Sequence, residues 1–125
     1  MKQHTLLYLI EGGNAVPDVG RINKEDVEKT IQNLKSKFLS KLGIKDIEVA
    51  GSGGKKSSSG DLDILIQTND PNEFLDKAEA LAKQNHIISK NLKGLQILSI
   101  RFPIANQKDK FVQIDLMPTQ DIKYM

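Results

Sequence analysis

The sequence contains no cysteine and no tryptophan, and its only aromatic residues are four Phe and two Tyr. Without cysteine the chain can form neither a disulfide nor a thiolate site, as is usual for a cytoplasmic protein. With so few aromatic residues, aliphatic side chains must build the hydrophobic core. The two histidines, His4 and His86, do not have the spacing of a histidine-rich metal site. Thiol chemistry is therefore excluded, and a zinc site of the histidine type is not indicated.

An excess of charge of one sign and a long hydrophobic run are also missing. The chain has 18 basic and 16 acidic residues, a net charge of +2, which is too balanced to indicate nucleic acid or an anionic membrane as a partner. The apolar run over residues 6–10 is far too short to span a bilayer. At 125 residues the size is typical of one domain. We therefore expect a single cytoplasmic domain over residues 1–125 that has no membrane partner.

The pattern of apolar residues predicts an alternation of strands and helices. We expect a buried strand at 4–10, a helix at 23–42 stopped by Gly43, and a strand at 44–50. Asp70 is expected to cap a second helix that ends near residue 85. A short strand at 87–88, a turn at 91–94 and a hairpin of strands 95–102 and 111–117 complete the chain. This order predicts an α+β (mixed α/β) fold, in which helices cover one face of a mixed sheet.

The stretch from residue 49 to residue 67 carries the clearest chemical signal. Successive side chains on a strand point to opposite faces, so Asp61 and Asp63 share one face while Leu62, Ile64 and Ile66 share the other. Two neighbouring carboxylates repel each other unless a cation lies between them, and Mg²⁺ prefers carboxylate oxygen. The loop before them, GSGGKKSSSG, offers unobstructed backbone N–H groups and two ammonium groups, which suit a polyphosphate.

A third carboxylate appears in the strand at 111–117. Val112, Ile114 and Leu116 share one face, and Asp115 points to the other with Gln113. A lone Asp in an apolar strand is costly unless it is paired. If this strand neighbours the one that carries Asp61, the three carboxylates converge. Three carboxylates beside a cationic loop, with no candidate nucleophile, indicate metal-assisted phosphoryl transfer.

This pattern resembles the DNA polymerase beta-type nucleotidyltransferase superfamily. The shared features are a Gly-Ser pair, eight residues, then DLDILI, and a later strand with one Asp. The resemblance implies a nucleotidyltransferase-like mixed sheet backed by helices and a metal-dependent enzyme that uses Mg²⁺ or Mn²⁺. It implies transfer of a nucleoside monophosphate from a nucleoside triphosphate to an acceptor hydroxyl, with release of pyrophosphate. Carried over, Asp61, Asp63 and Asp115 are the catalytic metal ligands, and Gly51 and Ser52 bind the triphosphate.

The chain departs from the family pattern in two ways. Lys55 and Lys56 stand in the loop where polymerase members usually carry Arg, so these lysines are our candidates for further phosphate contacts. Larger members hold the nucleobase on a helical region after the third carboxylate, but only eight residues follow Met117 here. We therefore expect either a minimal member or a catalytic-domain fragment from the N-terminal part of a longer protein. We also expect weak discrimination among the four bases.

The sequence leaves other functions open. The acceptor can be nucleic acid (RNA or DNA) or protein, and the oligomeric state is not indicated. One alternative is a minimal toxin–antitoxin-type nucleotidyltransferase, working with a helical partner, that modifies protein or RNA. The other is a degenerate module that binds nucleotides or supports an assembly without catalysis. A plain Gly/Ser linker also fits the composition of residues 51–60, but the carboxylate-bearing strand that follows at once argues against it.

Overall fold

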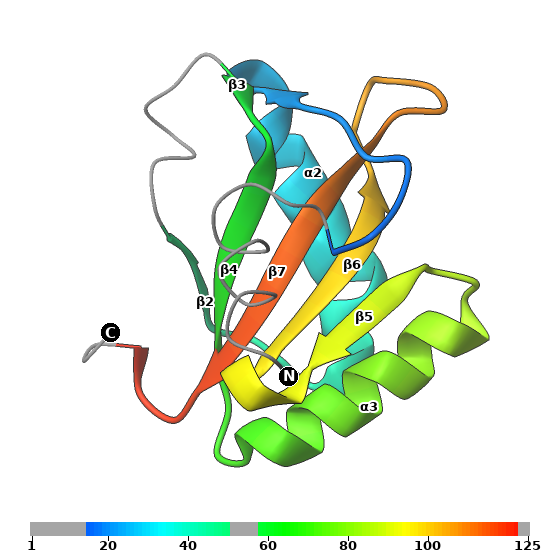
Figure 1. Cartoon of the computed structure of the whole chain (residues 1–125). Helices are drawn as coiled ribbons and strands as arrows, with labels where there is room; N and C mark the ends of the chain where they lie inside the picture. Colours follow the sequence, from blue (N-terminus) through cyan, green and yellow to red (C-terminus); the bar gives the residue numbers. More distant parts are fainter. Residues whose placement is uncertain (1–14, 51–57, 123–125) are drawn as a thin grey trace.

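The computed structural model describes residues 15–50 and 58–122, and these form an α+β fold (Figure 1). A five-stranded mixed sheet has the order β2-β4-β7-β6-β5. The central strands β4 and β7 run parallel, and all other neighbours in this sheet are antiparallel. The strands are β2 (Ile47–Ala50), β4 (Asp61–Gln67), β5 (Ser89–Leu92), β6 (Ile97–Pro103) and β7 (Phe111–Thr119).

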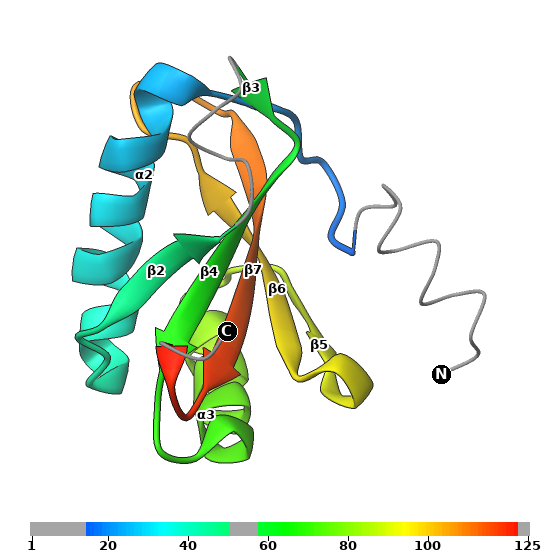
Figure 2. The ribbon, with the colours of Figure 1, turned by 90° about the vertical axis from the view of Figure 1, so that its left-hand side faces the viewer.

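Two helices pack against one face of this sheet, as predicted. They are α2 (Lys24–Lys37) and α3 (Pro71–Gln84), and Figure 2 shows both on the same side of the strands. The core between the helices and the sheet is mainly aliphatic, and Phe38, Phe74 and Phe102 are its aromatic residues. Every second residue of the three central strands enters this core: Leu62, Ile64 and Ile66 from β4, Leu98, Ile100 and Phe102 from β6, and Val112, Ile114 and Leu116 from β7. The opposite face of the sheet therefore carries the alternate residues, among them the aspartates.

The helix ends follow the predicted signals in part. The Asp70 side chain accepts a 3.1 Å hydrogen bond from the backbone N–H of Glu73, and Pro71 begins α3, as expected. Asn23 occupies the cap position of α2, but its side chain makes no capping hydrogen bond. The α-helix stops at Lys37, because Phe38 leaves the helical conformation (φ −124°). A 3₁₀ turn, η1 (Leu39–Leu42), continues to Gly43, which adopts the left-handed conformation (φ 72°) that glycine tolerates best.

Three predicted segments differ from the structure or lie outside it. The strand expected at 87–88 lies instead at Ser89–Leu92, and the expected turn at 91–94 is replaced by the end of β5 and a 3₁₀ turn, η2 (Lys93–Leu95). The N–H of Ile87 donates to the carbonyl of Ala82 at the end of α3, so the helix terminus uses the group that a strand would need. The strand expected at 4–10 lies outside the described residues.

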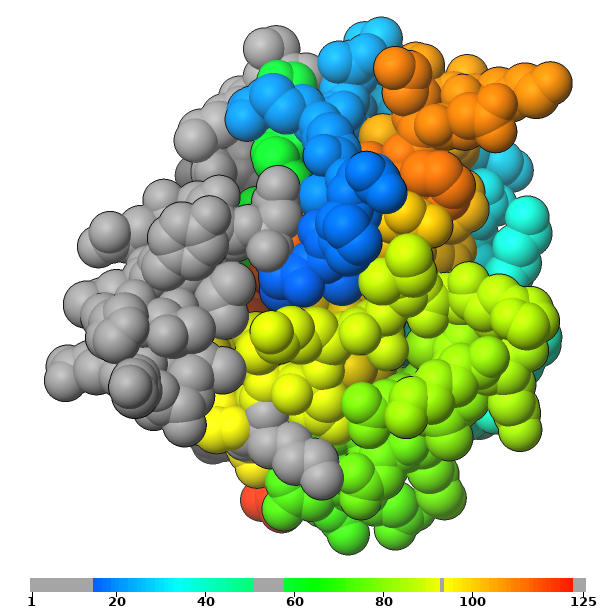
Figure 3. Space-filling model, turned by 45° about the vertical axis from the view of Figure 1, so that its right-hand side comes forward, coloured from blue at the N-terminus to red at the C-terminus, as the bar shows by residue number. Residues whose placement is uncertain are grey.

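A small second sheet, which the sequence did not predict, lies beside the start of β4. β1 (Ile22–Asn23) pairs with β3 (Ser58–Ser59) in antiparallel register. The segment before β1 crosses the open face of the main sheet. The backbone N–H of Gly20 donates to the carbonyl of Phe111, and the side chain of Arg101 lies 3.5 Å from Asp18. Figure 3 shows this segment, in dark blue, against the yellow surface of β5 and η2.

Candidate metal centre

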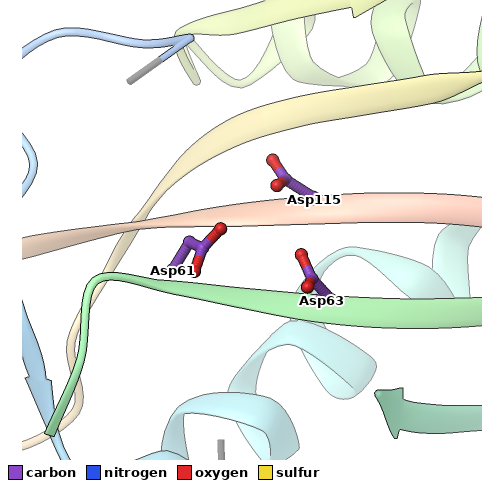
Figure 4. A group of neighbouring side chains, drawn as sticks. All are labelled: Asp61, Asp63 and Asp115. Carbon is purple, nitrogen blue, oxygen red and sulfur yellow. The ribbon is translucent and has the colours of Figure 1, made fainter. Parts of the chain in front are cut away.

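The parallel pair β4 and β7 brings the three predicted aspartates together. In the register of this pair Asp63 lies opposite Asp115, and Asp61 lies opposite Gln113. One carboxylate oxygen from each of Asp61, Asp63 and Asp115 lies within 4.8 Å of the other two. Figure 4 shows the three side chains on the same side of the two strands, which is the face away from the helices. The expected convergence of carboxylates is therefore present.

Packing side chains this close shifts the protonation of two aspartates. Burial, followed by the negative charges of Asp61 and Asp115 and a hydrogen bond shared with Asp115, raises the pKa of Asp63 to about 7. Burial also raises the pKa of Asp115, although hydrogen bonds from Ser99 and Gln113 oppose that rise. The metal-free cluster thus resists carrying its full negative charge at neutral pH. A divalent cation would remove this repulsion, and three carboxylates are a donor set that suits Mg²⁺ or Mn²⁺.

Two neighbouring side chains hold Asp115 in place. Ser99, its register partner on β6, donates a 2.6 Å hydrogen bond from Oγ to Asp115 Oδ1. Gln113 donates a 3.0 Å hydrogen bond from Nε2 to the same oxygen. The amide of Gln113 is oriented in turn, because its Oε1 accepts the backbone N–H of Ala15 at 2.8 Å. Both donors act on Oδ1, and two hydrogen bonds to one oxygen fix the direction of the carboxylate.

The aspartates line one side of a cavity of about 200 Å³ on the open face of the sheet. The rest of its lining is mixed: Ala15, Leu92, Leu95, Ile97, Ser99, Gln113 and Met117. Apolar walls beside the carboxylates lower the local polarity, which strengthens any interaction between the aspartates and a cation. The aspartates therefore lie at a small cavity in which Asp61 is exposed and Asp63 and Asp115 are half-buried.

Sequence reasoning missed one cation, Arg21, which lies just before β1. Its Nε donates to Ser58 Oγ at 2.9 Å, and its Nη2 donates to the Ser58 carbonyl at 3.0 Å. A Cβ atom on Gly60 would lie 3.5 Å from Nη1, so the guanidinium lies beside the residue that precedes Asp61. Arg21 is 40 residues away from Asp61 in the sequence, and only the β1–β3 pairing, which has no local sequence signal, reveals this proximity.

The remaining predicted site residues cannot be placed. Gly51, Ser52, Lys55 and Lys56 lie in residues 51–57, outside the described part of the chain. The described residues on either side of this loop, Ala50 and Ser58, end β2 and begin β3. Ala50 is the register partner of Asp63. The phosphate-binding role of the loop therefore stays a prediction.

Comparisons with known proteins give no identity for this chain. No protein-family model matches it, and no curated protein is significantly similar to it. Within residues 15–50 and 58–122, no helix is long and apolar enough to cross a membrane. The described residues form an α+β fold with a mixed five-stranded sheet and two helices packed on it, and three of its aspartates form a cluster that could hold a metal ion.

Proposed function

We propose that the protein is a metal-dependent nucleotidyltransferase. It would move a nucleoside monophosphate from a nucleoside triphosphate to an acceptor hydroxyl and release pyrophosphate. The observation that supports this most is the convergence of Asp61, Asp63 and Asp115 on the open face of the sheet. The resemblance of the Gly-Ser, DLDILI and later Asp pattern to the DNA polymerase beta-type superfamily points to the same chemistry.

The aspartates of β4 and the aspartate of β7 have different parts in this proposal. Mg²⁺ or Mn²⁺ held by the three carboxylates would neutralise the charge that develops on the transferring phosphoryl group and on pyrophosphate. Asp61 and Asp63, on β4, would hold the metal that binds the α-phosphate. Asp115, on β7, faces the acceptor hydroxyl and takes its proton. The acceptor oxygen forms a bond to the α-phosphorus, and the bond from that phosphorus to the bridging oxygen breaks, with its electrons leaving on pyrophosphate.

Asp115 must be ionised to accept a proton, and its two hydrogen-bond donors favour that state. The hydrogen bonds from Ser99 and Gln113 favour its charged form and oppose the rise in pKa caused by burial. They also fix the direction of the carboxylate, which matters because proton transfer requires a short and aligned approach. Ser99 and Gln113 are therefore positioning residues, since they act through Asp115.

Arg21 is placed to bind the β- and γ-phosphates, which leave as pyrophosphate. Two of its N–H groups are held by Ser58, and within the described part of the chain it forms no ion pair. A guanidinium fixed in this way keeps its outer N–H groups available for phosphate oxygens. In our proposal Arg21 acts with Gly51, Ser52, Lys55 and Lys56 on the β- and γ-phosphates. Arg21, from the segment before β1, would then take the role of the Arg that polymerase members usually carry in the loop.

Incubation with nucleoside triphosphates labelled at the α-phosphate tests the proposal. Each of the four is supplied with Mg²⁺ or Mn²⁺, together with RNA, DNA or a protein mixture as acceptor. We expect pyrophosphate release and transfer of the label to one acceptor class, and we expect Asp63→Asn to abolish both. The matched control is Asp46→Asn, which changes an exposed aspartate before β2. Metal-dependent nucleotide binding without pyrophosphate release from any mixture would instead favour a non-catalytic nucleotide-binding module.

A further inference from the structure

A second and larger cavity, of about 760 Å³, adjoins the aspartate cavity. Leu95, Ile97 and Met117 line both, so the two cavities share a wall. The larger one lies where β4 and β7 end, between η2, the start of α3 and the segment after β7; these elements meet at the lower end of the sheet in Figure 1. Crevices beyond the carboxyl ends of parallel strands are common ligand sites in mixed and parallel sheets.

The lining of this larger cavity differs in chemistry from that of the aspartate site. Leu95, Ile97, Met117 and Pro118 give it apolar surface. Its polar groups are mostly neutral side chains that can both donate and accept hydrogen bonds: Asn69, Asn72, Gln96, Thr119 and Gln120. The charged member of the described lining is Asp70, and its carboxylate caps α3. No Lys or Arg belongs to the lining that the structure describes, so the cavity suits a neutral group rather than phosphate.

The side-chain amides of Gln96 and Asn72 contact each other at this cavity, and a ligand could take the place of this contact. Gln96 Nε2 donates to Asn72 Oδ1 at 3.4 Å, which is long for a hydrogen bond. Gln96 adopts a left-handed backbone conformation (φ 54°) between η2 and β6, which is uncommon for a residue other than Gly, Asn or Asp. Both residues are exposed. Asn and Gln amides recognise base edges by paired donor and acceptor contacts, and thioether sulfur packs favourably on aromatic rings.

The spacing of residues along β7, from Asp115 to the larger cavity, is comparable with the length of a nucleotide. Met117 is two residues beyond Asp115 on β7, and Thr119 is four residues beyond it. At about 3.3 Å per residue these positions lie about 7 and 13 Å along the strand from Asp115. A phosphate at the aspartates would thus place the base of the same nucleotide beside Met117, within the larger cavity.

We propose that the cavity between η2, the start of α3 and the end of β7 binds a nucleobase. This inference rests on the proposed function, because it places the phosphate of the same nucleotide at the three aspartates. The base is stacked on Met117 and contacted by the amides of Asn72 and Gln96. It belongs to the nucleoside triphosphate or to the 3′-terminal nucleotide of an acceptor, since both place a phosphate or hydroxyl at the aspartates. The weak base discrimination expected from the short C-terminal region would then be replaced by a measurable preference.

NMR on isotopically labelled protein tests the cavity directly, with the side-chain amides of Asn72 and Gln96 and the methyl group of Met117 as probes. The ligands are tripolyphosphate, free nucleosides, the four nucleoside triphosphates and a short oligonucleotide with a 3′-hydroxyl, each in Mg²⁺. We expect nucleosides and one of the two nucleotide sources to shift the three probes, and tripolyphosphate to leave them unchanged. Shifts with the oligonucleotide but not with the triphosphates would assign the base to the acceptor. Probes that no nucleoside or nucleotide moves would overturn the proposal.

Substitutions at the cavity separate the base from the phosphates. We expect Gln96→Ala or Asn72→Ala to weaken binding of the preferred nucleotide at least fivefold and to leave tripolyphosphate affinity within twofold. Gln32→Ala, at an exposed position on α2, is the matched control and should change neither. Unchanged nucleotide affinity in both cavity variants would contradict the proposal. If nucleosides shift the probe signals but tripolyphosphate does not bind, the base site is supported. The same result would count against the proposed phosphoryl transfer.

Discussion

Asp63 and Asp115 lie directly opposite each other on the parallel strands β4 and β7, on the face of the sheet that the helices leave open. Asp61 completes the cluster from two residues earlier on β4. Burial and mutual repulsion hold the pKa of Asp63 at about 7, far above its ordinary value of 3.8. When both carboxylates are charged and no cation is bound, their repulsion lowers the free energy of unfolding of the protein.

Asp63→Asn should remove activity, keep the fold and raise the stability of the metal-free protein. The substitution removes one of three like charges and leaves the volume almost unchanged, so repulsion is relieved. We expect an increase of about 1 kcal/mol in the free energy of unfolding at pH 8. Urea unfolding in EDTA measures it, with Asp46→Asn as the control that should change little. An unfolded Asp63→Asn variant would show that the side chain has an essential structural partner.

The stability of the metal-free protein should fall as pH rises from about 4 to 7. The folded state keeps a proton on Asp63 up to a pKa of about 7, whereas the unfolded chain loses it near 3.8. The unfolded state therefore binds fewer protons in this window, and unfolding becomes easier as pH increases. Because Asp63 is partly exposed, we expect this group to contribute on the order of 1–2 kcal/mol. Melting curves in EDTA from pH 4 to 8 should show this slope in the wild type and a smaller slope in Asp63→Asn; equal slopes would contradict it.

Ser99→Ala and Gln113→Ala should weaken metal binding without unfolding the protein. Both side chains donate to Asp115 Oδ1, and loss of such outer partners commonly lowers metal affinity or activity 10–100-fold. Mn²⁺ titration followed by electron paramagnetic resonance measures the affinity. Ser36→Ala, at an exposed position on α2, is the control. If both variants bind Mn²⁺ as tightly as the wild type, Asp115 does not depend on these hydrogen bonds.

Arg21→Ala should reduce affinity for tripolyphosphate at least tenfold, because a charge-assisted contact to phosphate is worth roughly 1.5–3 kcal/mol and a tenfold change is about 1.4 kcal/mol. Mn²⁺ affinity without phosphate should stay the same, since Arg21 does not contact the carboxylates in the structure. Lys41→Ala, which removes an exposed cation from η1, is the matched control for net charge. Equal tripolyphosphate affinity in Arg21→Ala and Lys41→Ala would exclude a specific phosphate contact.

Local sequence rules predicted the aspartate cluster because strand alternation is strict. Once Leu62, Ile64 and Ile66 are placed in the core, Asp61 and Asp63 must lie on the other face, and the same holds for Asp115 beside Ile114 and Leu116. That β4 and β7 are neighbours was only an assumption at that point. It depends on long-range pairing, which the pattern of a single strand does not encode.

The features that sequence reasoning missed depend on distant partners. β5 lies at Ser89–Leu92 rather than 87–88 because pairing with β6 selects the register Ser89 to Ile100, while Ile88 stays 38% exposed. β1 and β3 are too short to have a periodicity of their own, so the position of Arg21 beside Gly60 was not predictable. The hydrogen bond from Ala15 to Gln113 spans 98 residues and follows only from the complete fold.

Anomalous diffraction from crystals soaked in Mn²⁺ with a nucleoside triphosphate analogue that resists transfer tests the central claim most directly. We predict one or two strong Mn²⁺ peaks within about 2–2.5 Å of oxygen atoms of Asp61, Asp63 and Asp115. The α-phosphate of the analogue should lie against the same ions. Absence of a Mn²⁺ peak at the three aspartates would contradict the account. A nucleotide bound elsewhere on the protein, with no metal at the aspartates, would contradict it as well.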